Sequence, residues 1–207
     1  MKKIAVFVSG GGTNLQAIID AIKSGYIKEG YIEIVVSNKN DAYGLERAIK
    51  NGIKAMFFDP KEYPQREVYD EYLAGKMNSM NIDLICLAGY MRILTGIFID
   101  KFQGKIMNIH PALLPSFGGP GMYGLKVHEA VLNYGVKITG CTVHFVDKGV
   151  DSGPIIIQKC VEVDENDTPE TLQKKVLQLE HKAYPEAVKL FTEDKLIIEG
   201  RKVKILK

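Results

Sequence analysis

The chain lacks several features that would place it in a specialised class of protein. Its 207 residues include only three cysteines, at positions 86, 141 and 160, and no C-x-x-C pair. An odd number of dispersed cysteines argues against a disulfide framework or a structural zinc site, so we expect reduced core cysteines in a cytoplasmic protein. No apolar run is long enough to span a membrane, and the apolar N-terminus runs into glycines without a signal-peptide cleavage site. That segment predicts a first strand.

A strong excess of charge is also missing. The 27 basic and 25 acidic residues leave a net charge of +2, and no stretch is rich in Lys and Arg. The surface therefore has no basic run along which a nucleic-acid backbone could bind. We expect small-molecule substrates as partners, with neither nucleic acid nor a membrane, and a monomer or weak homodimer.

Apolar runs rich in β-branched residues alternate with helical patterns in the first half of the chain. The expected strands cover residues 4–9, 32–37, 54–58, 84–88 and 106–109. The expected helices cover residues 14–24, 43–51, 66–80 and 95–102. This alternation predicts parallel strands with helices on both faces of the sheet.

The pattern changes after residue 115, where a glycine-rich loop precedes a helix at 125–133 and two long strands at 138–146 and 155–163. Their short connection suits an antiparallel pair. A long helix is expected over 168–191, which Pro185 should bend or break, and residues 199–201 form a turn between two last short strands. We therefore predict an α/β fold: a single doubly wound, mostly parallel sheet with helices on both faces, antiparallel strands in the C-terminal half and a long C-terminal helix.

An amide and an imidazole close the fifth expected strand, in the sequence M-N-I-H-P. Residues two apart on a strand share a face, so Asn108 and His110 should point the same way, and Pro111 ends the strand. Open α/β sheets bind ligands at this edge, where the ends of the first, fourth and fifth strands should converge. An amide can stabilise an oxyanion while an imidazole moves a proton, as acyl transfer requires. A polar strand end with a buried, hydrogen-bonded histidine is the alternative interpretation.

A glycine-rich turn, S-G-G-G-T-N, follows the first strand and opens the first helix. Backbone amides and the positive end of the helix suit a phosphate at Gly11, Gly12, Thr13 and Asn14. The turn does not match G-x-G-x-x-G, because Leu15 occupies the third glycine position, and no Walker A motif is present, so a nicotinamide cofactor is disfavoured. A plain strand-to-helix turn capped by Thr13 is the alternative.

Asp151 lies in the connection between the two long strands, within H-F-V-D-K-G-V-D-S-G-P. Held there, its carboxylate could pair with His110, raise the pKa of the imidazole and set its tautomer. By itself, an Asp in this context is usually a turn former. His144 could face the same crevice or lie in the core. Because no His/Glu pair has the spacing of helix-borne ligands, we expect no metal ion.

Three segments together, S-G-G-G-T-N-L-Q, M-N-I-H-P-A-L-L-P and H-F-V-D-K-G-V-D-S-G-P-I, resemble the folate-dependent phosphoribosylglycinamide formyltransferases of purine synthesis. The resemblance extends over nearly the whole chain, including S-N-K-N-D-A-Y-G-L-E-R-A, L-A-G-Y-M-R-I-L and E-H-K-A-Y-P. It implies one formyltransferase domain over residues 1–207, with a phosphate-binding, Rossmann-like half at 1–110 and a folate-binding half at 111–207 that completes the catalytic site. It also implies 10-formyltetrahydrofolate as co-substrate and no metal.

The resemblance also implies roles for individual residues. Asn108, His110 and Asp151 would be catalytic: Asn108 and a protonated His110 stabilise an oxyanion, and Asp151, with an ordered water, helps to move a proton. Residues 11–14 would hold the substrate phosphate, Glu180 its ribose or glycinamide end, and His144 would lie close by. The folate site would be formed by Arg66, near the glutamate tail, and by Met91, Arg92, Ile93, Leu94, Val146 and Val150.

Other functions stay open from the sequence. Formylation of methionyl-tRNA would need a further RNA-binding domain, and hydrolysis of formyltetrahydrofolate a regulatory domain; 207 residues leave room for neither. A nucleotide-binding oxidoreductase would share the first turn and the parallel sheet, but it has no use for Asn108 beside His110. A non-catalytic sugar-phosphate binding module would bind its ligand without turnover.

Overall fold

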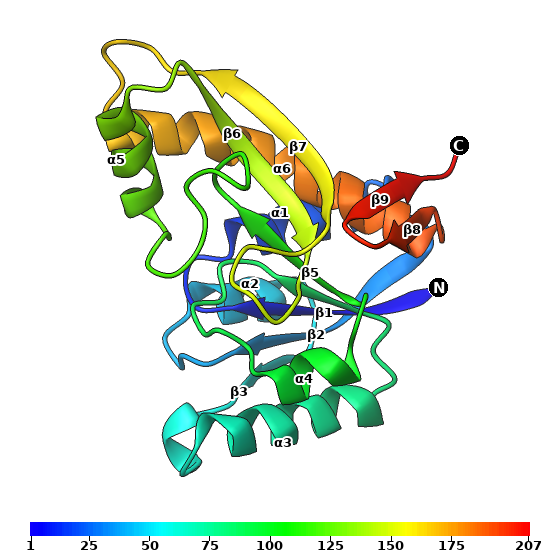
Figure 1. The fold of residues 1–207 in the computed structure, drawn as a ribbon. Helices are drawn as coiled ribbons and strands as arrows, with labels where there is room; N and C mark the ends of the chain where they lie inside the picture. Colours follow the sequence, from blue (N-terminus) through cyan, green and yellow to red (C-terminus); the bar gives the residue numbers. More distant parts are fainter.

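The computed structural model describes residues 1–207 and folds them around a nine-stranded sheet (Figure 1). The strands are β1 (Lys2–Val8), β2 (Gly30–Ser37), β3 (Ala55–Phe57), β4 (Leu84–Leu87), β5 (Ile106–His110), β6 (Ile138–Phe145), β7 (Ile155–Glu162), β8 (Leu196–Glu199) and β9 (Lys202–Ile205). The helices are α1 (Thr13–Lys23), α2 (Tyr43–Lys50), α3 (Arg66–Ser79), α4 (Gly96–Lys101), α5 (Leu125–Tyr134) and α6 (Pro169–Thr192), with a 3-10 turn, η1, at Pro60–Glu62. The predicted ends of β1 to β7 and of α1 to α6 all fall within about two residues of the observed ones.

The strand order is β3-β2-β1-β4-β5-β6-β7-β9-β8. The first five strands are parallel, and β6 and β7 continue the sheet as an antiparallel pair. The chain crosses from β3 at one edge to β4 on the other side of β1, so the direction of winding reverses between β1 and β4. The predicted doubly wound, mixed sheet is confirmed, and its ligand crevice is expected at this reversal.

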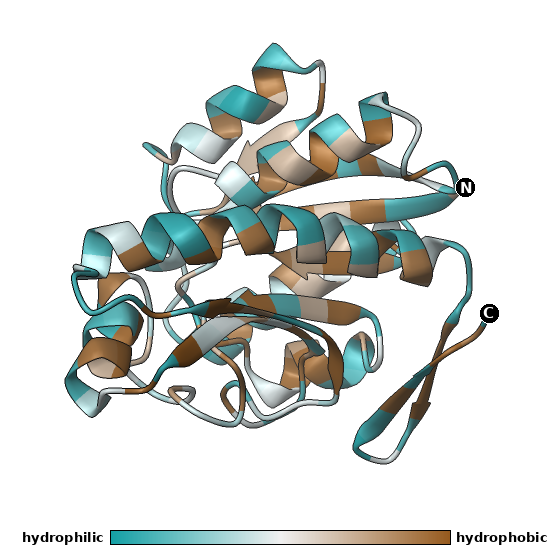
Figure 2. Cartoon of the chain, turned by 90° about the horizontal axis from the view of Figure 1, so that it is seen from above, coloured by the Kyte–Doolittle hydropathy of each residue, from teal (hydrophilic) through white to brown (hydrophobic).

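Alternation along β1 divides the core between the two faces. Ile4, Val6 and Val8 pack with residues of α1 and α6, whereas Ala5 and Phe7 pack with residues of α3 and α4. Hydrophobic and hydrophilic segments alternate along each helix (Figure 2), as in helices that bury one face. The two layers of helices therefore follow from the two-residue period of the strands.

The same alternation places the polar residues of β5. Met107 and Ile109 belong to the core under α1 and α6, and Ile106 belongs to the core under α3 and α4. Asn108 and His110 consequently face the α3 and α4 side of the sheet. Helix α4 has only six residues, and loops supply most of the residues that line the cavity around these two side chains.

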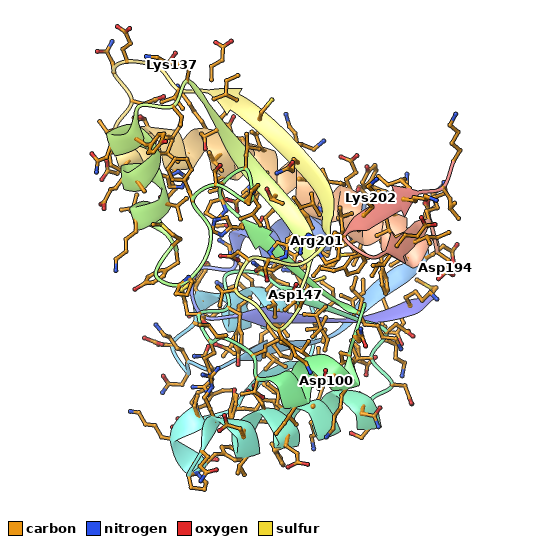
Figure 3. The ribbon with its side chains drawn as sticks, in the orientation of Figure 1. Asp100, Lys137, Asp147, Asp194, Arg201 and Lys202 are labelled. Carbon is orange, nitrogen blue, oxygen red and sulfur yellow. The ribbon has the colours of Figure 1, made fainter.

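The loop between β6 and β7 supplies much of this cover and is fixed at both ends. Lys148 pairs with Asp100 of α4, Nζ to Oδ1, at 2.9 Å, and Arg201 from the β8–β9 turn donates to the Ser152 carbonyl at 2.8 Å. Figure 3 shows Asp147 of this loop, Asp100 below it and Arg201 above it. Elements distant in the sequence thus hold the loop against the sheet.

Three expectations need correction. Pro185 does not break α6, because one missing backbone hydrogen bond is offset by the burial of its neighbours Tyr184, Ala187 and Val188. Thr13 is the first helical residue of α1 and does not cap it. Cys160 is exposed rather than in the core, since alternate residues of β7 face solvent; Cys86 and Cys141 are buried, and all three thiols are free.

None of the helices combines the length and the apolar character needed to cross a membrane.

Candidate active site

A cavity of about 770 Å³ lies where the ends of β1, β4 and β5 converge. The turn after β1 (residues 10–14), the loop after β4 (88–94) and the end of β5 (108–111) form its walls, and loops 119–124 and 146–151 complete it. Its volume is in the usual range for small-molecule sites, about 300–1,000 Å³. The crevice predicted from the sequence is therefore confirmed in position.

Asn108 and His144 form a directly opposed pair across β5 and β6. The His144 ring donates from Nδ1 to the Phe145 carbonyl at 2.9 Å, since a carbonyl can only accept. Its Nε2 therefore accepts from Asn108 Nδ2 at 3.2 Å. His144 is only 2% exposed yet lines the cavity. The question left open by the sequence is thus answered: His144 is buried and also faces the crevice.

His110 lies between two acceptor oxygens. Nε2 donates to the Phe117 carbonyl at 2.8 Å, and Nδ1 faces Asp151 Oδ2 at 3.4 Å. Burial lowers the pKa of His110 below its ordinary value, although the charge of Asp151 opposes that effect. Asp151 thus acts to raise the pKa of the imidazole, as expected from the sequence, but burial outweighs this effect and makes the net shift downward. Burial therefore favours the neutral ring, whereas the carboxylate that faces Nδ1 favours the protonated ring.

Asp151 holds its place in a left-handed backbone conformation (φ 53°), which Asp tolerates better than most residues. Burial acts to raise the pKa of this carboxyl, but the nearby His144 ring, the positive charge that His110 carries when protonated and the Gly119 N–H together lower it below its usual range. The Gly119 N–H donates to Oδ2 at 3.0 Å. Asp151 is thus ionised at neutral pH. A Cβ at Gly118 would lie 2.5 Å from Leu114 Cδ2 and 3.2 Å from Asp151 Cβ, so the glycine leaves room for both side chains.

The turn after β1 leaves the N-terminus of α1 open. Gly12 occupies the cap position at φ 68°, no side chain caps the helix, and its first turn holds no acidic residue. Free backbone N–H groups at a helix N-terminus bind anions. A Cβ at Gly12 would lie 2.8 Å from Gly44 Cα, whereas none at Gly10 or Gly11 would meet an atom within 4 Å. Both its left-handed backbone angle and the close approach of α2 therefore require a glycine at position 12.

Asn14 and Glu180 join the first and last helices at the edge of the cavity, with Asn14 Nδ2 donating to Glu180 Oε2 at 2.6 Å. Glu180 is 9% exposed. Burial raises the pKa of Glu180 to about 7, and the Asn14 hydrogen bond only partly opposes this rise. An isolated, nearly buried carboxylate of this kind favours a cationic or hydrogen-bond-donating ligand group.

Replacing Glu180 with Gln is expected to stabilise the ligand-free protein at pH 8 and to have little effect at pH 4. Folding raises the pKa of Glu180 from 4.5 to about 7. The contribution of Glu180 to the free energy of unfolding is therefore fully present below pH 4.5 and is lost as the pH rises through 7. The loss corresponds to about 3 kcal/mol. Denaturant unfolding of both proteins across this pH range measures the difference. Equal stability at pH 8 would contradict the raised pKa.

The residues assigned to folate by resemblance divide into two groups. Six line the cavity: Met91, Arg92, Ile93, Leu94, Val146 and Val150. Arg66 does not line it; its Nη2 donates to the Ile93 carbonyl at 2.6 Å, behind the cavity wall. The assigned phosphate residues 11–14, together with Asn108, His110, His144, Asp151 and Glu180, all line the same cavity.

Sequence reasoning missed His128 and Gln173, which also line the cavity. His128 of α5 is almost completely buried and its Nδ1 has no hydrogen-bond partner. Burial, and the positive charge that His110 carries when protonated, lower the pKa of His128 to about 4. The helical spacing of Val127 and Val131 marks the buried face of α5 and could have placed His128 at its edge.

Comparisons with known proteins agree with this geometry. The formyl transferase family model matches residues 2–188. The phosphoribosylglycinamide formyltransferase, chloroplastic, of Arabidopsis thaliana is 42% identical over 196 residues, which cover 94% of this chain and 67% of that protein. The trifunctional purine biosynthetic protein adenosine-3 of Gallus gallus is 46% identical over 188 residues, which cover 91% of this chain but only 18% of that protein.

Solved structures give the same result. Glycinamide ribonucleotide transformylase 1 from Symbiobacterium toebii superposes with a TM-score of 0.94 at 49% identity, covering 100% of this chain and 95% of that one. The phosphoribosylglycinamide formyltransferase from Coxiella burnetii superposes with a TM-score of 0.91 at 39% identity, covering 99% and 93%. Sequence, fold and cavity together lead to one conclusion: this chain belongs to the formyl transferase family.

Proposed function

We propose that this chain transfers the formyl group of 10-formyltetrahydrofolate to the amine of 5'-phosphoribosylglycinamide, a step of purine biosynthesis. One observation carries the proposal: a single cavity brings together an open helix N-terminus, the buried carboxyl of Glu180 and the cluster of Asn108, His110 and Asp151. The names of relatives that match nearly the full length of the chain support it. Family membership implies a folate-derived one-carbon donor; the 10-formyl form belongs to the proposal.

The cavity divides naturally between two substrates. The phosphate of the acceptor would bind the first turn of α1, and Glu180 would face its ribose or glycinamide end. The folate would bind along residues 91–94 and the apolar side chains of Val146 and Val150. In this arrangement residues 1–110 supply the phosphate-binding half of one formyltransferase domain, and residues 111–207 complete the catalytic site.

Asn108 would stabilise the oxyanion that forms when the amine attacks the formyl carbon. As the new C–N bond forms, the carbonyl electrons move to oxygen and need a hydrogen-bond donor. One N–H of Asn108 is held by His144 at 3.2 Å, whereas its contact with Asp151 Oδ1 is long, at 3.4 Å. The second N–H is therefore available to the substrate oxygen.

Asp151 and His110 would carry the proton between the two nitrogens. The pKa values of Asp151 and of His110 are both lowered, which favours an ionised carboxylate and a neutral ring, so the pair can accept the proton that the attacking amine loses. The imidazolium that results adds positive charge beside the oxyanion. When the oxyanion collapses, the bond from carbon to N10 breaks and the proton passes to N10 of the leaving tetrahydrofolate.

The proposal also covers the cellular compartment and the oligomeric state. We place the enzyme in a reducing compartment, the cytoplasm, because its three thiols are free. It would act on small molecules as a monomer or a weak homodimer.

Mixing the protein with 10-formyltetrahydrofolate and phosphoribosylglycinamide tests the function. We expect the formylated folate to disappear at a rate that depends on the second substrate. Loss of the formyl group without phosphoribosylglycinamide would indicate a hydrolase instead. Binding of phosphoribosylglycinamide with no turnover would indicate a binding module, and hydride transfer to a nicotinamide would indicate an oxidoreductase.

A further inference from the structure

We propose that one face of α3 shapes the folate half of the cavity from behind, with Tyr69 and Asp70 as positioning residues. Arg66, Tyr69 and Asp70 are spaced three and four residues apart, so they project from the same side of the helix. All three contact the loop of residues 90–95, which we call the folate loop. This inference rests on the proposed function, since it concerns how one of the two substrates is held.

The folate loop has little structure of its own. It connects β4 to α4 without helix or strand, and its side chains at positions 91 and 93 are about half exposed. Near its start, the Met91 N–H donates to Ser9 Oγ at 2.8 Å. Residues 90–94 nevertheless form one wall of the cavity. Contacts from outside the loop must therefore fix its shape.

Two charged side chains of α3 hold the backbone at the far end of the loop. Arg66 Nη2 donates to the Ile93 carbonyl at 2.6 Å, and Asp70 Oδ2 accepts from the Thr95 N–H at 2.6 Å. The two contacts lie on either side of Leu94, whose side chain is buried and lines the cavity. Hydrogen bonds with one charged partner are stronger than neutral ones, so this pair strongly restricts the loop backbone.

Tyr69 orients the side chains at the start of the loop. Its hydroxyl donates to the Phe58 carbonyl at 3.3 Å, so the Tyr90 hydroxyl must donate to Tyr69 Oη, also at 3.3 Å. The face of its ring lies 4.6 Å from the guanidinium carbon of Arg92. The Nε of Arg92 has no hydrogen-bond partner. Tyr69 thus orients the Arg92 guanidinium along the cavity wall. No carboxylate pairs with this guanidinium and draws it away from the ring.

Neither positioning residue can touch a ligand. Tyr69 and Asp70 are buried, at 0% and 1% exposure, and neither lines the cavity. Their effect must pass through the folate loop, whereas the phosphate turn after β1 and Glu180 lie on other elements. Disturbing the α3 face should therefore weaken folate binding selectively. If Tyr69 and Asp70 had a merely structural role, their replacement would weaken the binding of both substrates or lower only the stability of the fold.

Steady-state kinetics of Asp70→Ala test this inference. We expect the KM for 10-formyltetrahydrofolate to rise about tenfold, the effect of losing one charge-assisted hydrogen bond. The kcat and the KM for phosphoribosylglycinamide should stay within about twofold of the wild type. Asp70→Asn keeps an acceptor oxygen and should restore most of the lost affinity. Glu71→Ala, which removes the next carboxylate along the same helix, is the matched control and should change none of these constants.

Hydrogen exchange gives a readout that does not depend on activity. In Asp70→Ala the Thr95 amide should exchange at least about tenfold faster, while amides of β2 keep their rates. If Asp70→Ala does not fold, Tyr69→Leu replaces it and should raise the same KM, with Tyr72→Phe on the exposed side of α3 as its control. An unchanged folate KM in an active variant, or an equal rise of both KM values, would overturn the inference. Absence of turnover in the wild type would instead refute the proposed function.

Discussion

Replacing His110 with alanine is expected to lower kcat by about 10²–10⁴-fold while leaving the affinity for phosphoribosylglycinamide nearly unchanged. The imidazole faces Asp151 Oδ2 at 3.4 Å and the Phe117 carbonyl at 2.8 Å, and it has no contact with the turn that would hold the phosphate. The change therefore removes the proton carrier without removing the main anchor of the acceptor. Steady-state kinetics and calorimetric titration with phosphoribosylglycinamide measure the two quantities separately.

Asp151→Asn should reduce kcat by a similar factor, because an amide neither accepts the amine proton nor stabilises the imidazolium. His181→Gln changes a histidine outside this cavity and serves as the control, with most activity retained. Near-normal turnover of His110→Ala would remove it from the catalytic set. If Asp151→Asn failed to fold, Asp151 would be a structural turn residue, which its left-handed backbone also allows.

Removing the phosphate from the acceptor is expected to weaken binding by at least about 10²-fold. The open N-terminus of α1 has no side-chain cap and no acidic residue to compete with a bound anion. Charge-assisted hydrogen bonds contribute roughly 1.5–3 kcal/mol each, so two or three of them make the phosphate the main anchor. Competition of glycinamide ribonucleoside and ribonucleotide at one folate concentration measures the ratio. Comparable use of both would show that the glycine turn is only a turn.

Gly12→Val should cause a similar loss of affinity for the acceptor, but the structure shows that obstruction of the phosphate is only one of its causes. A side chain there would collide with Gly44 Cα and would be strained at φ 68°, so the variant also disturbs the contact between the turn and α2. Gly11→Val is the cleaner test, because no atom lies within 4 Å of the added Cβ. It should weaken phosphoribosylglycinamide binding while folate binding and the stability of the fold are kept.

The two-residue and helical periods of the sequence predict most of the fold. They place Asn108 and His110 on one face of β5 at the edge where ligands bind, and the cavity confirms that position. They do not fix the register between β5 and β6, which sets Asn108 opposite His144. For that reason the place of His144 stayed open until the structure showed it.

Burial and remote contacts account for the rest of what the sequence did not predict. The sequence predicted that Asp151 raises the pKa of His110, which it does, but not that burial by other elements would lower the pKa by more. The persistence of α6 through Pro185 likewise depends on tertiary packing. Arg66 was assigned by resemblance to the folate tail, whereas its observed contact is the Ile93 carbonyl, a backbone atom that no sequence pattern marks.

The contact between Asn14 and Glu180 has a consequence for the order in which the protein acquires activity. The two residues are 166 positions apart, and they lie on α1 and α6, which are separated by most of the strands and helices described above. Closing so long a segment of chain is entropically costly and slow compared with forming the local strand and helix units. During synthesis or refolding, a compact sheet can therefore exist before any substrate pocket does. Recovery of enzyme activity should lag behind recovery of the circular dichroism signal, by the time that α6 needs to pack against α1.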